Sequence, residues 1–307
     1  MLDLRLISYF LMICETENIT KAAERLHLTQ PTLSRQMHDL EERLGMPLFI
    51  RSKRKTVLTE EGRLLKRRAE EILALVEKTE QEMARLEGTL EGDVYIGCGE
   101  TESMREVARV IARVQSVHPG IHFHFFSGNE ADVLERLDKG LLDFGVLIAP
   151  SQLAGHTYLP LARPDVWGLL LPKDQPLAEK TSIQAKDLVG VPLIVSRQTM
   201  KNQELRPWLH SVAEKLSFQA DYNLLYNAAL LVEEGAGCAM ALDGIISTGR
   251  DSRLTFRPLA PRVEAKVYLV WQNKQVFSKA AAYFKDEMLD ALSGQEVPAE
   301  KGAEDDG

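Results

Sequence analysis

The sequence predicts an α/β protein of several domains that begins with a small, mainly helical domain. Its 307 residues are more than one ordinary hydrophobic core fills, so two or three domains are expected. Apolar residues among the first 45 recur at helical spacing. After Gly92 short apolar runs alternate with helical stripes, which is typical of βαβ units.

The composition is that of a globular protein, with 45% hydrophobic and 27% charged residues. It excludes a collagen-like or wholly disordered chain. No apolar run approaches the roughly 18 residues of a membrane span, and the first residues lack the basic start and apolar core of a signal peptide. The three cysteines, Cys14, Cys98 and Cys238, are scattered and odd in number, which argues against a disulfide framework. We therefore expect a cytoplasmic protein without a membrane partner.

The charge is unevenly distributed along the chain. The net charge is -8, yet residues 1–59 carry nine basic and seven acidic side chains. Within residues 51–68 there are eight basic side chains against two acidic ones. Such a block on an acidic protein can mark a contact with a polyanion. On charge alone, an exposed helix start would explain it equally well.

The first residues predict three helices in succession. Asp3, Asn18 and Thr29 are placed to cap them, and Pro31 is tolerated in a first turn. Residues 28–32 form a tight turn between the second and third helices. The apolar stripes are Ile7, Phe10, Leu11 and Cys14; Ile19, Ala22, Ala23 and Leu26; and Leu33, Met37, Leu40 and Leu44.

Two short helices joined by a tight turn, the second opening with polar side chains, form the helix-turn-helix pattern. In the DNA major groove Gln pairs with adenine, Arg pairs with guanine, and the Thr methyl group contacts thymine. The alternative is an ordinary solvent-facing surface of a three-helix domain. The polar side chains off the third stripe are Gln30, Thr32, Ser34, Arg35 and His38.

A basic β-hairpin is predicted next, with a strand at 46–51, a basic turn at 52–56 and a returning strand at 57–58. A hairpin beside a helix-turn-helix is a wing, whose tip can contact phosphates or the minor groove. With this wing, residues 1–59 resemble the winged helix-turn-helix DNA-binding domain of LysR-type transcriptional regulators. The residues that carry the resemblance are Phe10, Thr20-Lys21-Ala22-Ala23, Leu26, residues 29–36, Leu40-Glu41, Leu44-Gly45, Leu48-Phe49, Arg51, Arg54 and residues 58–62.

The resemblance implies a set of contacts with double-stranded DNA. It places one group of residues on the bases and puts Arg51 and Arg54 on the backbone or in the minor groove. Thr29, His38 and Lys53 adjoin these positions and are included as candidates. The group expected on the bases is Gln30, Pro31, Thr32, Ser34 and Arg35.

Residues 60–91 predict a long linker helix. Thr59 is a good N-cap, and Glu60 and Glu61 suit the first turn. Apolar positions then alternate at spacings of four and three, the seam of a coiled coil; a long core helix is the alternative. LysR-type proteins dimerise through such a helix, which implies a homodimer or homotetramer. The predicted dimerisation residues are Leu65, Ala69, Ile72, Val76, Met83 and Leu86.

The rest of the chain predicts a parallel sheet covered by helices. Strands are expected at 93–97, 121–125, 142–148, 167–171, 193–195, 238–242 and 267–271, and helices at 107–114, 133–137, 203–216, 227–234 and 278–292. Residues 294–307 are polar and acidic and predict a disordered tail.

This half resembles the LysR effector domain, a two-lobed fold similar to type II periplasmic binding proteins. The resemblance implies a first lobe at 92–163 and 264–293 and a second lobe at 164–263. Gln175 stands where His is usual, and Leu242-Asp243 stands where Leu-Pro is commoner, so the pocket is this chain's own. The matching residues are Gly128, Leu134, Leu137, Gly140, Leu142-Asp143, Pro176-Leu177-Ala178, Leu188, Val232 and Gly235-Ala236-Gly237.

Ligands of such folds bind beyond the carboxyl ends of parallel strands, against helix N-termini. Residues 99–103 and 196–199 are in those positions and offer hydroxyl groups and one arginine. This suggests a small anionic effector, such as a carboxylate. Helix capping alone would also explain the hydroxyls, and Glu100 and Glu102 would oppose an anion if they pointed inward. The predicted effector-binding residues are Thr101, Glu102, Ser103, Ser196 and Arg197.

The sequence therefore predicts a LysR-type transcription factor that responds to a small molecule, with RNA polymerase as a further partner. We find no catalytic motif, so no enzyme activity and no cofactor are expected. His122 and His124 share a strand face but lack supporting ligands, so no metal site is expected. The alternatives are a stand-alone binding protein of the periplasmic type and a redox-sensing regulator that uses Cys98 or Cys238.

Overall fold

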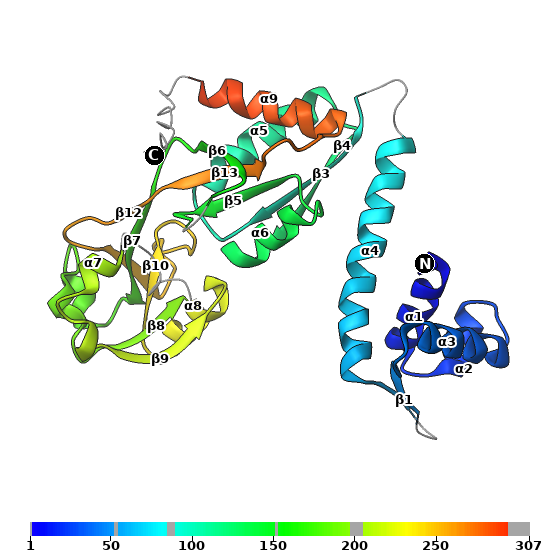
Figure 1. The fold of residues 1–307 in the computed structure, drawn as a ribbon. Coiled ribbons are helices and arrows are strands. Elements are labelled where there is room, and N and C mark those ends of the chain that lie inside the picture. The colour runs from blue at the N-terminus through cyan, green and yellow to red at the C-terminus, as the bar shows by residue number, and fades with distance from the viewer. Residues whose placement is uncertain (1, 52–54, 85–89, 151–152, 197–204, 294–307) are drawn as a thin grey trace, which may run out of the picture. The chain divides into compact units, whose positions relative to one another are not determined.

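The computed structural model describes residues 2–51, 55–84, 90–150, 153–196 and 205–293. The chain divides into two compact units, residues 1–86 and 87–307, which are described in turn (Figure 1). Among the described residues, no helix is long and apolar enough to cross a membrane. The tail at 294–307, Lys53, Arg54, Leu86 and Arg197 lie outside these ranges, as does the start of the helix predicted at 203–216.

The first unit contains the predicted helices and hairpin. The three short helices are capped as expected, because the side chains of Asp3, Asn18 and Thr29 each accept a backbone N–H. Gly45, with a φ of 69°, ends the third helix in the left-handed region that favours glycine. The elements are α1 (Leu4–Thr16), α2 (Ile19–Arg25), α3 (Gln30–Leu44), β1 (Phe49–Arg51), β2 (Thr56–Leu58) and α4 (Glu60–Ala84), with β1 and β2 antiparallel.

The long helix α4 begins against the hairpin. Thr59 accepts a hydrogen bond from the Gly62 N–H at 2.9 Å and donates one to the Pro47 carbonyl at 2.8 Å. A side chain at Gly62 would collide with the Leu48 carbonyl, so only glycine allows this approach. The turn that begins α4 is therefore fixed to the wing.

Part of the predicted coiled-coil seam is used inside the chain. Ala69 is fully buried in the core of the first unit, and Leu65 and Ile72 are half-buried against that core. Helix α4 packs on α1 along this stretch. The prediction that Ala69 belongs to the dimer seam is therefore corrected, because its side chain is already covered within the chain. For Leu65 and Ile72, which remain partly exposed, it stays a prediction. Farther along α4, Leu75 and Met83 are exposed.

The second unit has two sheets, one in each lobe. The first lobe has the strand order β4-β3-β5-β13-β6. Helices α5 and α9 pack on one face of this sheet and α6 packs on the other (Figure 1). Its elements are β3 (Gly92–Cys98), α5 (Met104–Val117), β4 (Ile121–Ser127), α6 (Glu130–Asp138), β5 (Phe144–Ile148), β6 (His156–Pro160), β13 (Val267–Gln272) and α9 (Lys279–Leu292).

The second lobe has the strand order β11-β7-β10-β8-β9, with β12 paired to β7. Its apolar core lies mainly under β7, β8 and β10. The helices are short, and three-residue to four-residue 3-10 turns connect several strands. The elements are β7 (Asp165–Pro172), β8 (Pro192–Ser196), α7 (Leu205–Leu209), β9 (Ser217–Tyr222), α8 (Leu225–Glu233), β10 (Cys238–Leu242), β11 (Leu254–Pro258) and β12 (Glu264–Ala265).

The prediction of a parallel sheet is correct only in part. Strands β3, β4 and β5 are parallel, and so are β8, β9 and β10. Strand β13 is antiparallel to both of its neighbours, and β7 is antiparallel to β10 and β11. The mixed sheets arise because strands at the crossovers run back between the lobes. The helix predicted at 203–216 is also wrong in length, since α7 covers only Leu205–Leu209.

Two chain segments cross between the lobes. One connects β6 to β7, and the other returns through β12 to β13. They are bonded to each other, because the N–H of Leu161 donates to the Val267 carbonyl at 2.8 Å and that of Trp167 to the Val263 carbonyl at 2.9 Å. This paired crossover positions the cleft between the lobes.

Candidate nucleic-acid interface and binding cleft

Helix α3 presents a polar surface opposite its apolar stripe. Leu33, Met37 and Leu40 are fully buried in the core of the first unit, which fixes the rotation of the helix. The remaining side chains must therefore face outward. Thr29, Gln30, Pro31, Thr32, Arg35 and His38 are exposed, and Ser34 is half-buried.

Several of these polar side chains hold one another in place. The hydroxyl oxygens of Thr29 and Thr32 are 2.7 Å apart, and the Gln30 amide donates to the Ser34 hydroxyl at 2.8 Å. His38 Nε2 lies 3.4 Å from a carboxylate oxygen of Glu42. The first turn of α3 thus offers an ordered row of donors and acceptors, the requirement for reading base edges.

The wing is tied to the helices by two acidic residues that the sequence reasoning missed. Glu41 Oε1 accepts the backbone N–H groups of Leu48 at 2.8 Å and Phe49 at 3.2 Å. At the other strand, Glu17 pairs with Lys55 at 2.6 Å. The hydrogen bond from Lys55 lowers the pKa of Glu17. No local signal reveals either role, because both carboxylates bind across a turn or to another element rather than within their own helix.

The tip of the wing lies partly outside the residues that the structure describes. Lys53 and Arg54 are not among the described residues, and for Arg51 only the backbone is described, as part of β1. The described pairs of the hairpin are Phe49 with Leu58, Ile50 with Val57, and Arg51 with Thr56. Ile50 and Val57 are exposed on one face, 59% and 49% respectively.

A cavity of about 140 Å³ lies between the two lobes of the second unit. The first lobe contributes residues 99–100, 128–130 and 146–149. The second lobe contributes Trp167, Ser196, residues 222–223, Leu225, Leu242 and Ile245. Of the predicted effector-binding residues that the structure describes, only Ser196 lines this cavity. Gly99 and Glu100, which follow β3, and Ser196, the last residue of β8, therefore line the same cavity, as the strand-end rule predicts.

The described residues of the predicted anion site are not brought together, because Thr101 and Ser103 bind an acidic residue of the chain itself. The Thr101 hydroxyl donates to Asp165 Oδ2 at 2.5 Å. The Ser103 hydroxyl and backbone N–H donate to Asp165 Oδ1 at 2.7 and 3.2 Å. Burial raises the pKa of Asp165, and these hydrogen bonds oppose that rise. Neither hydroxyl lines the cavity between the lobes.

Glu102 lies beside a second cavity of about 200 Å³ at the crossover, which Ser103 and Asp165 also line. There the Glu102 carboxylate accepts a hydrogen bond from Arg105 at 2.5 Å. Glu102 is thus separated from Ser196, with which it was predicted to share a ligand.

The helix N-termini around the cleft are already occupied by side chains of the chain. Asp165 caps the start of α5 through the Ser103 N–H. Asn129 and Asp132 form a capping box at the start of α6. Glu100, from the first lobe, accepts the Leu225 N–H at the start of α8 in the second lobe. An anionic ligand would have to compete with these groups for the backbone donors.

The thiol chemistry of the cleft region is unfavourable for redox sensing. Cys238 is buried and donates to Gln175 Oε1 at 3.3 Å, and burial raises its pKa to about 11. Burial, followed by the negative charge of Glu100, raises the pKa of Cys98. Both thiols are therefore protonated at neutral pH, whereas a reactive cysteine needs the thiolate.

Within the described residues, no group of His, Cys, Asp and Glu side chains is arranged to hold a metal ion. His124 Nε2 instead lies 2.8 Å from Asp93, and its ring stacks on Tyr95.

Together, a winged helix-turn-helix with an ordered polar surface and a two-lobed domain with an interlobe cavity define a ligand-binding DNA-binding protein. Comparisons with known proteins give the family. Residues 4–63 match the family model for bacterial regulatory helix-turn-helix proteins of the LysR family, and residues 87–293 match the model for the LysR substrate binding domain. The chain belongs to the LysR family of transcriptional regulators.

Two named transcriptional regulators are similar in sequence over most of this chain. The HTH-type transcriptional regulator IlvY of Escherichia coli is 27% identical over 243 residues, which cover 78% of this chain and 81% of the relative. The Hca operon transcriptional activator HcaR of Escherichia coli is 28% identical over 284 residues, covering 90% and 93%.

Solved structures share the fold. The LysR family regulator CbnR has a TM-score of 0.74 at 18% identity, covering 95% of this chain and 99% of its own. Full-length CbnR in complex with its target DNA has a TM-score of 0.73 at 19% identity, covering 94% and 100%.

Proposed function

We propose that this chain regulates transcription by binding a promoter or operator through α3 and the wing, and that a small molecule in the interlobe cavity controls this binding. The observation that carries the proposal is the ordered polar face of α3, which is exposed while the opposite face is fully buried. RNA polymerase is a further proposed partner. We further propose that the protein acts in the cytoplasm and has no catalytic role.

Paired copies follow from the way such domains read DNA. Two recognition helices placed about 34–36 Å apart, one turn of DNA, contact the two halves of a pseudo-palindrome. Helix α4 is the element through which we propose that two copies associate, as a homodimer or as half of a homotetramer. Its exposed apolar residues support this proposal.

Effector control requires a difference in affinity. A small molecule shifts the arrangement of the lobes only if it binds one arrangement more tightly than another. The cavity is lined from both lobes, so its ligand would contact both. A change in the lobes would then alter the spacing of the paired DNA-binding domains.

A gel-shift assay tests the central proposal. The purified chain should bind a labelled fragment from upstream of its own gene at modest ionic strength. The same fragment without label should compete for this binding more effectively than an unlabelled scrambled fragment. Specific binding should also weaken steeply with added salt, because basic side chains displace counterions from the phosphates. A protein that is monomeric and retains every fragment equally poorly would refute the proposal.

A further inference from the structure

The first turn of α3 contains two polar side chains that hold each other in place. Gln30 and Ser34 are four positions apart, so they are neighbours on the helix surface. The Gln30 amide nitrogen Nε2 donates to the Ser34 hydroxyl at 2.8 Å. Within the described part of the chain, neither side chain has another hydrogen-bond partner. The orientation of each therefore depends on the other.

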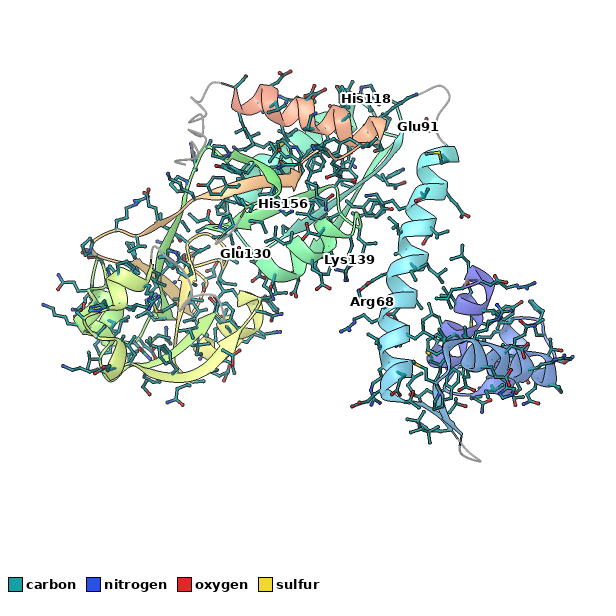
Figure 2. All side chains as sticks on the ribbon, viewed as in Figure 1. Arg68, Glu91, His118, Glu130, Lys139 and His156 are labelled. Carbon is teal, nitrogen blue, oxygen red and sulfur yellow. The ribbon has the colours of Figure 1, made fainter. Side chains whose placement is uncertain are left out.

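The backbone beneath this pair is fixed. The Thr29 side chain caps the helix by accepting the Thr32 N–H, and the ring of Pro31 restricts its own backbone angle. Leu33 is fully buried in the core of the first unit. Side chains with nitrogen and oxygen atoms project outward from the helices of this unit (Figure 2). Because its backbone is held, the placement of the Gln30 amide depends on the side chain alone.

The hydrogen bond to Ser34 leaves the Gln30 amide with the groups that recognise adenine. A glutamine amide has two N–H donors and one carbonyl oxygen. One N–H is bonded to Ser34, so the second N–H and Oε1 remain. In the major groove adenine presents the N7 acceptor beside the N6 amino donor, and a glutamine amide pairs with both. Guanine presents two acceptors there, so it offers no donor to Oε1.

Ser34 also lowers the cost of contact with a base. A glutamine side chain has three rotatable bonds and loses conformational entropy when a base fixes it. A side chain that is already held before binding loses less. The hydroxyls of Thr29 and Thr32 do not take over this task, because their oxygen atoms are paired with each other at 2.7 Å. Without Ser34, the DNA itself would have to order the Gln30 amide.

From these observations, and resting on the proposed function of α3 as the DNA-reading helix, we infer that Ser34 is a positioning residue for Gln30, whose amide reads an adenine of the operator. Ser34 acts through Gln30 and not through a base contact of its own. The operator therefore contains an A·T pair whose adenine N6 and N7 atoms face the first turn of α3.

Fluorescence anisotropy with the full chain locates this adenine. Each A·T pair of the promoter fragment is replaced in turn by G·C, and Gln30 reads the position at which the wild type loses affinity but Gln30→Ala does not. At that position 7-deazaadenine, in which a C–H group replaces N7, should weaken wild-type binding about tenfold and Gln30→Ala binding less than about twofold. If no position behaves in this way, the inference is wrong.

A double-mutant cycle assigns the role of Ser34. Ser34→Ala should weaken binding to the matched operator about fivefold, because the Gln30 amide is no longer held before binding. In the Gln30→Ala background the same substitution should change the affinity less than about twofold, since no amide is left to position. Equal losses in both backgrounds would show that Ser34 acts independently and would overturn the assignment.

Ser8→Ala is the matched control for Ser34→Ala. Ser8 is also a half-buried serine on a helix, and its hydroxyl donates to the Leu4 carbonyl at 3.0 Å in α1. It should leave the affinity unchanged in both backgrounds. A loss equal to that of Ser34→Ala would mean that the effect of Ser34 is one of helix stability, which contradicts the inference.

A measurement without DNA separates positioning from folding. In ¹⁵N relaxation experiments the Gln30 side-chain amide should be ordered in the wild type and mobile in Ser34→Ala, while the backbone amides of α3 keep their order. A Gln30 amide that is equally mobile in both proteins would show that Ser34 does not hold it.

The wild type alone separates this inference from the proposed function. If it binds the promoter fragment specifically and Gln30→Ala retains its preference at every A·T pair, the inference fails and the proposed function stands. If the wild type binds no fragment specifically, the proposed function fails and the inference fails with it.

Discussion

At the residue scale, the chemistry of the second unit depends on Asp165, which begins β7 at the crossover between the lobes. Its carboxylate accepts hydrogen bonds from Thr101 and Ser103, residues more than sixty positions earlier in the chain. The three groups connect the crossover to the start of α5. The two hydroxyls therefore have a structural task, which explains why they are unavailable to a ligand.

The pH dependence of stability tests this arrangement. Burial raises the pKa of Asp165 above its ordinary value, so the folded chain binds this proton more readily than the unfolded chain. The free energy of unfolding of the wild type, relative to Asp165→Asn, should therefore increase as the pH falls from 7 towards 4. Urea unfolding followed by tryptophan fluorescence measures this difference within the second unit, because Trp167, Trp208 and Trp271 all belong to it.

The control for that experiment is Asp286→Asn, since the Asp286 side chain is 68% exposed. Its difference from the wild type should change little over the same pH range. If the difference in the free energy of unfolding between the wild type and Asp165→Asn is constant, or decreases towards pH 4, the pKa of the Asp165 carboxyl is not raised in the folded chain.

Arg35 is the residue for which the DNA proposal is most specific. It is exposed on α3, one turn beyond the start of the helix, and a bidentate arginine contact with guanine distinguishes bases. Arg35→Ala should cost about 1–3 kcal/mol on the matched operator and reduce the preference over a scrambled one. Arg43→Ala, at the far end of the same helix, should leave base preference intact. Fluorescence anisotropy with the matched and the scrambled operator measures both affinities. Equal losses of affinity and of base preference in Arg35→Ala and Arg43→Ala would contradict the assignment.

Local sequence signals predicted those features whose partners lie within a few residues. The caps Asp3, Asn18 and Thr29 are of this kind, because an N-cap bonds to its own helix. The pairing of Thr101 with Asp165 could not be predicted in this way, since a hydroxyl after a strand is equally suited to a ligand, a cap or a distant carboxylate. The fold decides among them.

At the scale of elements, α4 shows how one apolar pattern can serve two interfaces. The four-and-three spacing that begins at Leu65 predicted a single dimer seam. In the structure Ala69 is fully buried against the chain's own core, whereas Met83 is 59% exposed. The apolar positions of α4 continue beyond those that pack in the chain's own core. Their spacing alone does not indicate where the contact with one partner ends and the contact with another begins.

Two substitutions on α4 should therefore have different effects. Ala69→Glu places an unpaired charge in the core of the first unit and should cost roughly 3–5 kcal/mol of its stability. Met83→Glu should leave the unit folded but shift the protein towards monomers if α4 mediates association. Circular dichroism measures folding, and sedimentation measures association. A dimer unaffected by Met83→Glu would place the interface elsewhere.

The element predictions were weakest where tertiary pairing decides the structure. The strand β9, Ser217–Tyr222, was missed, because all six of its side chains are exposed or half-buried and no buried set alternates with them. The segment becomes a strand because it pairs with β8, and its own sequence does not indicate that pairing. The helices α5 and α9 were predicted well, because each has a continuous apolar face that packs on one sheet.

At the scale of the whole molecule, the link between the lobes of the second unit is what an effector must act on. Besides the paired crossover, a hydrogen bond between described residues bridges the cavity itself, from the Leu225 N–H at the start of α8 to the Glu100 carboxylate in the first lobe. A negative charge is favourable at a helix N-terminus. This contact therefore stabilises the arrangement of the lobes in the absence of a ligand, and a ligand bound near Glu100 would change its strength.

Loss of the Glu100 carboxylate should consequently release α8 from the first lobe. In Glu100→Ala the Leu225 amide loses its acceptor, and we expect its hydrogen exchange to be about tenfold faster or more, equivalent to roughly 1.4 kcal/mol. Glu100→Gln keeps an acceptor oxygen and should retain much of the protection. Exchange at Ala281, whose N–H is bonded to Ser278 in α9, serves as an internal reference. If the Leu225 amide exchanges at the same rate in Glu100→Ala and the wild type, the lobes are held by the crossover alone, and an effector must act there instead.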